Sequence, residues 1–146
     1  MVEDMIVELE YYIRKGVVKK SIKDIKRAVS LLKTARKRMK TAEKIDVRNF
    51  KLEFVYEAII ELIEALMSLE GYKSYSHEAD IAFLRKINFP ENIILKLDEV
   101  RRKRHRSKYY GVELKADKTE ELIKFCKDIF KKLEDLLESK IREVNP

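Results

Sequence analysis

Residues 101–108, RRKRHRSK, contain six Lys or Arg and no acid, and two tyrosines and a glycine follow them. Several cations together hold a phosphate backbone by counterion release, without reading its sequence. A run of like charge is also typical of a solvated helix face, where long side chains keep their charged ends in water. The candidate phosphate contacts of this segment are Arg101, Arg102, Arg106 and Lys108. The alternative is that these side chains only form a solvated surface of the helix.

Arg104 differs from its neighbours because of its position on the helix expected over about 90–108. Ile93 and Leu97 belong to the inward stripe of that helix, and Arg104 comes eleven residues after Ile93, only ~20° off the same direction. A desolvated guanidinium needs a carboxylate, a phosphate or several carbonyl groups as partners, and a glutamate of the long helix before it is the internal candidate. Arg104 therefore belongs either to a buried structural ion pair or to a functional site.

A stripe of lysines is a second candidate for phosphate binding. Residues 14–40 hold twelve Lys or Arg against Asp24 alone, and seven positions of this stretch recur at intervals of three and four. Like charges at this spacing repel by a few tenths of a kcal/mol per pair, and no acid on the stripe relieves them. The stripe is expected either to pair with glutamates of the next helix or to bind a phosphate backbone. The lysine stripe comprises Lys19, Lys23, Lys26, Ser30, Lys33, Lys37 and Lys40, and the glutamate stripe comprises Glu53, Glu57, Glu61 and Glu64.

The composition indicates a single all-α domain that covers residues 1–146. The chain has three glycines and two prolines, and its charged residues (40%) and apolar residues (45%) alternate at helical spacing. The apolar run 55–69 contains glutamates and cannot span a bilayer, and the acidic N-terminus lacks the basic residues of a signal peptide. We therefore expect a cytoplasmic protein with no membrane partner.

The sequence contains no pattern for a metal or a cofactor. The single cysteine, Cys126, lies among apolar positions of the last expected helix and is expected to be a buried, unreactive thiol. Di-metal carboxylate bundles use a Glu three residues before a His, and neither His77 nor His105 has one. His77 follows Ser76 at an expected helix start, where we expect its imidazole to be exposed or bonded locally.

Apolar residues that recur at three and four predict an antiparallel bundle of four main helices plus one or two short ones. The central helix is apolar on most sides, and Gly71 is expected to end it. Ser21, Ser76 and Asp117 are the expected N-terminal caps of three helices. The inward stripe of the second helix comprises Ile22, Ile25, Val29, Leu32, Ala35, Met39 and Ala42. The expected helices cover about residues 3–14, 21–42, 47–70, 76–86, 90–108 and 117–141, and the second could begin as early as residue 17.

The segment RHRSKY, residues 104–109, resembles the signature of HEPN domains (higher eukaryotes and prokaryotes nucleotide-binding). In that signature an arginine is followed by Asn, Asp or His, by three further residues and usually by a histidine. Arg104 and His105 match its first two positions. The stretch 57–84 is also similar to the region that precedes the signature in archaeal members, and the whole likeness covers about residues 50–125.

The resemblance implies an antiparallel helical bundle, commonly a homodimer, with a basic cleft across the interface that binds RNA or a nucleotide. Many members are metal-independent ribonucleases in which the arginine stabilises the phosphorane charge and the histidine moves a proton. Others pair with a minimal nucleotidyltransferase as toxin and antitoxin. The implied catalytic residues of this chain are Arg104, His105 and Tyr109, and Tyr109 stands where the family usually has histidine.

A phenol with a pKa near ~10 is a poor base at neutral pH, so either His105 takes that role or Tyr109 donates a proton as an acid. In a continuous helix, Arg104 and Tyr109 point ~140° apart. They can share one site if the helix unwinds before Gly111 or if two protomers each contribute one residue. The alternatives to an RNA-binding protein or ribonuclease are a subunit that docks a nucleotidyltransferase and a structural helical protein without catalysis.

Overall fold

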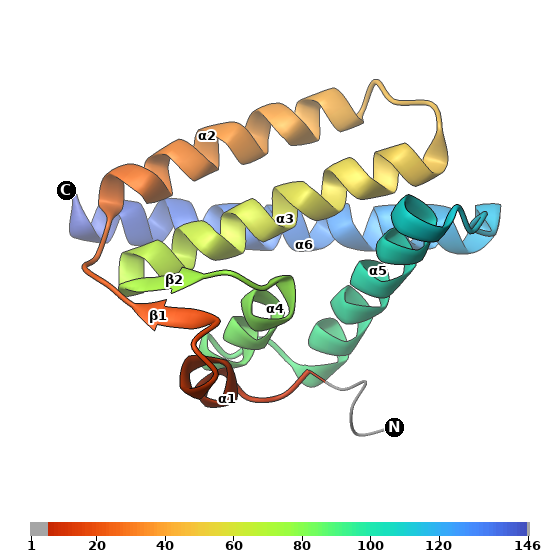
Figure 1. Cartoon of the computed structure of the whole chain (residues 1–146). Coiled ribbons are helices and arrows are strands. Elements are labelled where there is room, and N and C mark those ends of the chain that lie inside the picture. The colour runs from red at the N-terminus through yellow and green to blue at the C-terminus, as the bar shows by residue number, and fades with distance from the viewer. Residues whose placement is uncertain (1–5, 146) are drawn as a thin grey trace.

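The computed structural model describes residues 6–145, and within this range the chain is all-α (Figure 1). Six helices and one short antiparallel β-ribbon follow one another along these residues. The all-α class expected from the sequence is confirmed. The elements are α1 (Leu9–Arg14), β1 (Val18–Lys20), α2 (Ile25–Ala42), α3 (Arg48–Glu70), β2 (Tyr72–Ser74), α4 (His77–Lys86), α5 (Glu91–Tyr110) and α6 (Ala116–Val144).

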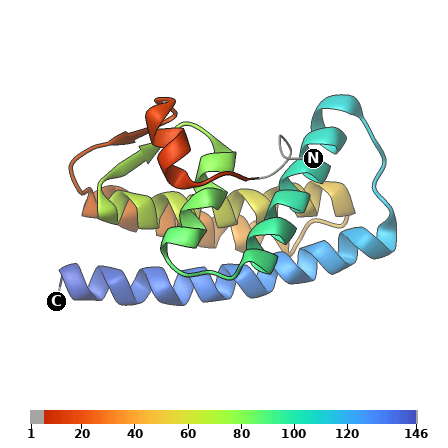
Figure 2. The same cartoon turned by 90° about the horizontal axis from the view of Figure 1, so that it is seen from below.

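α3 is the central helix of the bundle. It packs lengthwise against α2 and α6, and it also contacts α4, α5 and β2. Figure 2 shows α6 extending along the length of the bundle, with α5 running obliquely to both α3 and α6. The apolar residues of α3 are buried almost all around the helix, whereas α2 and α6 each bury one stripe. α3 lies at the centre of the bundle because a helix that is apolar on every side is stabilised only when all its sides are buried.

α5 crosses the N-terminal half of α3, and this crossing carries the basic segment to one end of the bundle (Figure 1). Ile94, Leu97 and Val100 bury the apolar side of α5. Near its C-terminal end, the Nδ2 of Asn49 at the start of α3 donates a hydrogen bond to Ser107 Oγ at 3.3 Å. The end of α5 therefore lies beside the beginning of α3.

Two helix boundaries follow their expected local signals. The Ser76 hydroxyl accepts a hydrogen bond from the backbone N–H of Ala79 at 3.3 Å, so α4 begins where the sequence indicates. Gly71 ends α3 in the left-handed conformation, with φ 82°. A Cβ added to Gly71 would lie 2.6 Å from the carbonyl oxygen of Ser21, so a larger residue would push that segment away from α3.

The segment before α2 differs from the helix that we considered for it. Residues 18–20 form a strand that pairs antiparallel with β2, Val18 lying opposite Ser74. Strands of three residues are too short to show the alternation of polar and apolar residues that identifies a strand. The first helix also starts later than expected, at Leu9, and residues 3–5 of its expected range lie outside the described part of the chain.

Two expected helix caps are wrong by a few residues. The cap of α2 is Asp24 and not Ser21, because the Asp24 carboxylate accepts a hydrogen bond from the backbone N–H three residues later at 2.9 Å. Ile22 and Ile25, expected in the core, are exposed because they precede or begin this shorter helix. α6 begins one residue before Asp117, which therefore lies in its first turn, where an acid favours the positive end of the helix dipole.

Candidate functional site

The basic segment forms the C-terminal half of α5, which stays helical to Tyr110. Gly111 ends the helix with φ 63°, a conformation that suits glycine. Beyond it, the backbone N–H of Val112 donates to the carbonyl oxygen of Arg106 at 3.3 Å. Cations are stabilised near a helix C-terminus because the helix dipole is negative there. The densest positive charge of this helix thus stands at the end that tolerates it.

Arg104 points into the bundle, as its spacing from Ile93 predicts. Its side chain is 11% exposed, and its Nη2 donates to Glu57 Oε1 of α3 at 2.6 Å. Its guanidinium carbon lies 5.6 Å from the centre of the Tyr56 ring. Among the described residues, its buried Nε has no hydrogen-bond partner. The expected pairing with a glutamate of the central helix is confirmed, and it anchors α5 on α3.

Three of the candidate phosphate contacts also have carboxylate partners. Asp98, which is almost completely buried, accepts a hydrogen bond from Arg101 Nε at 2.7 Å and lies 3.3 Å from Arg102 Nε. Lys108 Nζ lies 3.3 Å from a carboxylate oxygen of Glu53 on α3. Of the two Asp98 partners, Arg101 is 22% exposed and Arg102 is 51% exposed. Arg102 is therefore more available to a ligand than Arg101.

Lys103 and Arg106 are held differently from these cations. No carboxylate oxygen of residues 6–145 lies within 4.0 Å of their side-chain nitrogens. Both line a cleft of about 470 Å³ between α5 and the start of α6, together with Lys115 and one acid. They also line a second cleft of about 590 Å³ farther along α5, where Arg102 joins them. Cations thus make up at least half of the residues that line each of these two neighbouring hollows.

Three aromatic side chains gather on the exposed end of α5. The centre of the His105 ring lies 4.8 Å from that of Tyr109 and 5.8 Å from that of Tyr110. Tyr109 is 59% exposed and Tyr110 is 72% exposed. Lys108 Nζ lies 5.5 Å from the centre of the Tyr109 ring. His105 and Tyr109 meet because residues four apart are neighbours on one helix face.

The single chain brings His105 and Tyr109 together and keeps Arg104 apart from them. α5 does not unwind before Gly111, so Arg104 faces α3 while Tyr109 faces solvent. Local unwinding, the first of the two routes by which Arg104 and Tyr109 could share a site, is not what the structure shows. A site with both residues would need a second protomer.

Lys103 and Tyr110 are site residues that we did not expect from the sequence. Both belong to the basic and aromatic run, so the residue types of this run could have identified them as candidates. Which cations line a cleft depends on how α5 meets α6, and no local pattern encodes that. The same holds for a third cleft of about 640 Å³, which lies between the start of α3 and the α5–α6 loop and is lined in part by Arg48, Asn49 and Ser107.

His77 is the first residue of α4, as expected, but its partner lies on another helix. Its Nδ1 is 3.2 Å from the hydroxyl of Tyr56 on α3, and burial lowers the pKa of His77. One turn later Asp80 is fully buried, and neither of its carboxylate oxygens has a hydrogen-bond partner within the described chain. Burial, and then the neighbouring Glu64, raise the pKa of Asp80 well above its usual value. These groups lie inside the bundle, away from the exposed rings.

Cys126 is buried, as expected, and burial raises the pKa of its thiol, which disfavours the reactive thiolate. Within residues 6–145, no group of three or more His, Cys, Asp or Glu is placed to hold a metal ion. None of the helices in that range is long and apolar enough to cross a membrane.

Comparisons with protein-family models, with curated proteins and with solved structures find no match to this chain. The resemblance to HEPN domains therefore rests on residues 57–84 and 104–109. The site combines exposed aromatic rings at the end of α5 with two clefts that are lined in part by Lys103 and Arg106 of the same helix.

Proposed function

We propose that the protein binds single-stranded RNA, or nucleotides, at the C-terminal end of α5. The observation that carries this proposal is the cluster of His105, Tyr109 and Tyr110, whose exposed rings lie close together at the same end of α5 as Lys103 and Arg106. Neither of these two cations has a carboxylate partner among residues 6–145. Proteins that bind single strands combine a positive groove for the phosphates with aromatic rings on which the bases stack. The likeness of residues 104–109 to the HEPN signature supports the same ligand.

Lys103 and Arg106 are the main phosphate contacts in this proposal, because no carboxylate of residues 6–145 holds them and both line the clefts. Arg102 joins them, since it is half exposed and the buried Asp98 keeps Arg101 as a partner when Arg102 turns to a ligand. Arg104 has a different role: its pairing with α3 fixes the direction of α5 and so positions the rings. Binding of this kind is strongly salt-dependent and nearly independent of sequence.

The affinity for a single-stranded RNA of about 20 nucleotides, measured in excess chelator, tests the proposal. This RNA is longer than the roughly 4–16 nucleotides that one OB-fold domain covers. Tyr109→Ala combined with Tyr110→Ala should weaken binding by roughly tenfold or more, because stacking contributes ~1–3 kcal/mol per base. The matched control is Tyr75→Ala. Tyr75 is also exposed (61%) and lies near Lys19 and Lys73, but it belongs to the segment after β2.

We expect Tyr75→Ala to change the affinity by less than about twofold, as for an ordinary surface substitution. Equal losses in the control and in the double variant would overturn the assignment of the site to the end of α5. A wild-type protein that binds no RNA would reject the function itself. That result would favour the protein-partner alternative, in which the basic surface docks an acidic protein such as a nucleotidyltransferase.

Cleavage of the same RNA is a second activity, favoured by the contact between His105 and Tyr109. An imidazole and a phenol on one exposed surface can exchange protons with a bound substrate. The resemblance to HEPN domains implies that Arg104 also takes part in catalysis and that the protein is a homodimer. A site that contains both Arg104 and Tyr109 requires such a dimer. Cleavage that survives chelation and disappears in His105→Ala would establish a ribonuclease, whereas binding without cleavage would leave a binding protein.

A further inference from the structure

α2 contains seven Lys or Arg and no acid along its whole length. Its core side is formed by Ala28, Leu32 and Ala35. At 100° per residue, four lysines fall on the side opposite that core. We call this surface the lysine face of α2; it comprises Lys26, Lys33, Lys37 and Lys40, with Ser30 between them, and all five side chains are exposed.

The glutamate stripe of α3 does not neutralise the lysine face. Glu61 accepts hydrogen bonds from Nε and Nη2 of Arg38 at 2.9 and 3.2 Å, and Glu64 lies 3.6 Å from Arg27. The other two glutamates of the stripe pair with α5. The pairing between α2 and α3 that the sequence left open therefore occurs through arginines. These arginines lie about a third of a turn away from the lysines on the helix surface.

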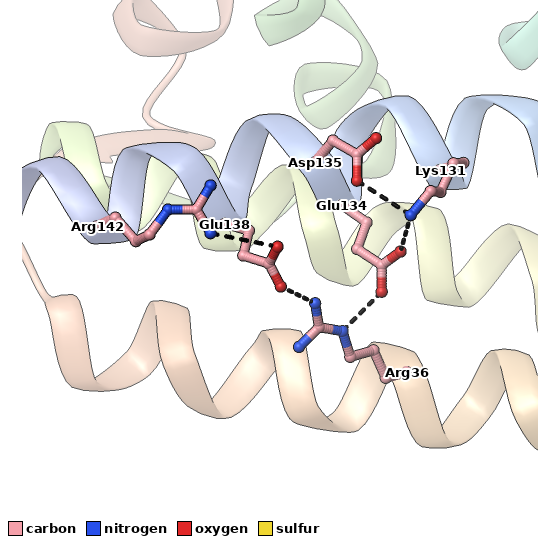
Figure 3. A network of polar contacts seen from close by, with 6 residues as sticks. All are labelled: Arg36, Lys131, Glu134, Asp135, Glu138 and Arg142. Carbon is pink, nitrogen blue, oxygen red and sulfur yellow. Dashed lines mark hydrogen bonds and ion pairs between the residues drawn. The ribbon is translucent and has the colours of Figure 1, made fainter.

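On the opposite flank of α2, an arginine is also ion-paired, in this case with glutamates of α6 (Figure 3). Arg36 lies between Glu134 and Glu138, with its Nε 2.6 Å from Glu134. In the same network, Lys131 and Arg142 of α6 pair with acids one turn away on their own helix. α2 offers its lysines no acid of this kind, because it contains none.

The two flanks leave the lysine face as a line of unneutralised charge. All three arginines of α2 are ion-paired, whereas no carboxylate oxygen of residues 6–145 lies within 4.0 Å of a lysine of this face. Lysines one turn apart on a helix repel one another. A bound polyanion would remove this repulsion and release counterions in the same step.

The composition of the face favours a phosphate backbone over other polyanions. Ser30 and Thr34 are exposed beside the lysines, and hydroxyls of this kind bond to phosphate and sugar oxygens. Lysine is depleted in the centres of protein interfaces, where aromatic residues are enriched, and the face has no aromatic residue. The apolar side of α2 is buried in the core, so this helix cannot lie in a membrane surface as an amphipathic helix does.

We infer that the lysine face of α2 is a second contact surface for RNA, which holds the phosphate backbone of the strand without reading its sequence. The face is ~21 Å long between Lys26 and Lys40, at 1.5 Å per residue, so it can follow several successive phosphates. α2 ends at the same end of the bundle as α5 (Figure 1), so one strand can reach both surfaces. The inference rests on the proposed function in naming RNA as the polyanion.

The salt dependence of RNA affinity tests the inference. Lys33→Gln with Lys37→Gln removes two charges and keeps a good helix former at both positions. The matched control is Lys124→Gln with Lys132→Gln, which makes the same change in net charge at two exposed lysines of α6. Each phosphate contact with a single strand contributes about 0.7 to the slope of log K against log salt, so the α2 variant should lower that slope by about 1.4. The control should leave it nearly unchanged.

Equal slopes for the α2 variant and the wild type, or equal changes in both double variants, would overturn the inference. If Tyr109→Ala with Tyr110→Ala still loses binding in that case, the proposed function stands without its second surface. A wild type that binds no RNA would overturn both. Wild-type binding to vesicles of phosphatidylcholine and phosphatidylserine, lost in the α2 variant while its RNA slope is unchanged, would replace RNA by a membrane.

Chemical acetylation of lysines, read by mass spectrometry, checks the location independently. Saturating RNA should protect the lysines of the lysine face from an amine-reactive reagent and leave Lys124 and Lys132 reactive. Unchanged reactivity of the lysine face in the RNA complex would overturn the inference, whatever the salt slopes are.

Discussion

α2 and the C-terminal half of α5 are both densely basic, but they hold their cations differently. In α5, Arg101, Arg104 and Lys108 each have a carboxylate partner, two of them on the central helix α3. In α2 the arginines have such partners, while the lysine face has none among the described residues. The position of a cation on its helix, more than the local density of charge, therefore separates structural cations from those that remain available to a ligand.

The chemistry of the two side chains explains this division. The planar guanidinium of Arg38 meets both oxygens of Glu61, a paired geometry that a lysine ammonium cannot reproduce. The arginines of α2 accordingly lie at its seams with α3 and α6, where partial burial strengthens such pairs. Lysine is more strongly hydrated, and the lysines of the lysine face stay on the outward side of α2. A count of Lys and Arg thus overstates the charge that α5 can offer to RNA.

Among the substitutions that test the division between structural and available cations, removing Arg104 should change stability the most. Arg104→Ala leaves Glu57 without its partner and removes the cation from the Tyr56 ring. We expect the free energy of unfolding to fall by about 3 kcal/mol, the lower end of the range for a broken buried pair, because Glu57 is 26% exposed. Urea unfolding followed by circular dichroism measures this change.

The matched control on the same helix is Arg106→Ala, which removes an exposed arginine that has no carboxylate partner in the described chain. We expect it to change the free energy of unfolding by less than about 0.5 kcal/mol. Lys33→Gln with Lys37→Gln should leave stability unchanged or raise it slightly, because two repelling charges are removed. A loss in Arg106→Ala as large as that in Arg104→Ala would contradict the division between structural and available cations.

A smaller effect, dependent on pH, is expected at His77, which bonds to Tyr56 beside the Arg104 anchor. Burial lowers the pKa of His77 in the folded protein below the ~6.5 of an exposed histidine. The folded protein then binds fewer protons than the unfolded chain. The contribution of His77 to stability is therefore present above about pH 6.5 and is lost as the pH falls through that value toward the folded pKa.

Unfolding by urea at a series of pH values between about 7 and 5 measures this contribution. The free energy of unfolding of the wild type should fall more steeply with decreasing pH than that of His77→Gln, by at most ~1.4 kcal/mol per pH unit for one proton. Parallel pH profiles of the two proteins would contradict the burial of a neutral imidazole at this position. The lysine face has no group that titrates in this range, so its variants should keep the wild-type profile.

The sequence predicts the helices and the inward position of Arg104 because these follow from spacing alone. An arginine eleven residues after Ile93 must return to the same side of a straight helix, and a glutamate of α3 is indeed its partner. The β-ribbon was missed because its strands are three residues long. The choice of arginines over lysines as partners of the glutamate stripe depends on the rotation of α2 about its axis, which tertiary packing sets.

The clefts beside α5 could not be predicted from the sequence for the same reason. They exist because α5 crosses the end of α3 obliquely and α6 then returns past it (Figure 1). Composition places cations and tyrosines in one run, but it does not show that Arg104 is enclosed while Lys103 and Arg106 line a hollow. The sequence thus predicts which segment forms the candidate site. Which of its residues anchor α5 and which remain available to a ligand is seen only in the folded structure.

Fluorine NMR of protein labelled with fluorotyrosine is the most direct test of RNA binding at the end of α5. The chain has seven tyrosines, and single Tyr→Phe variants assign their resonances. We expect saturating single-stranded RNA to shift the resonances of Tyr109 and Tyr110, and to leave those of the buried Tyr56 and the exposed Tyr75 in place. Unshifted Tyr109 and Tyr110 resonances at saturation, or a shift confined to Tyr75, would contradict the proposed site.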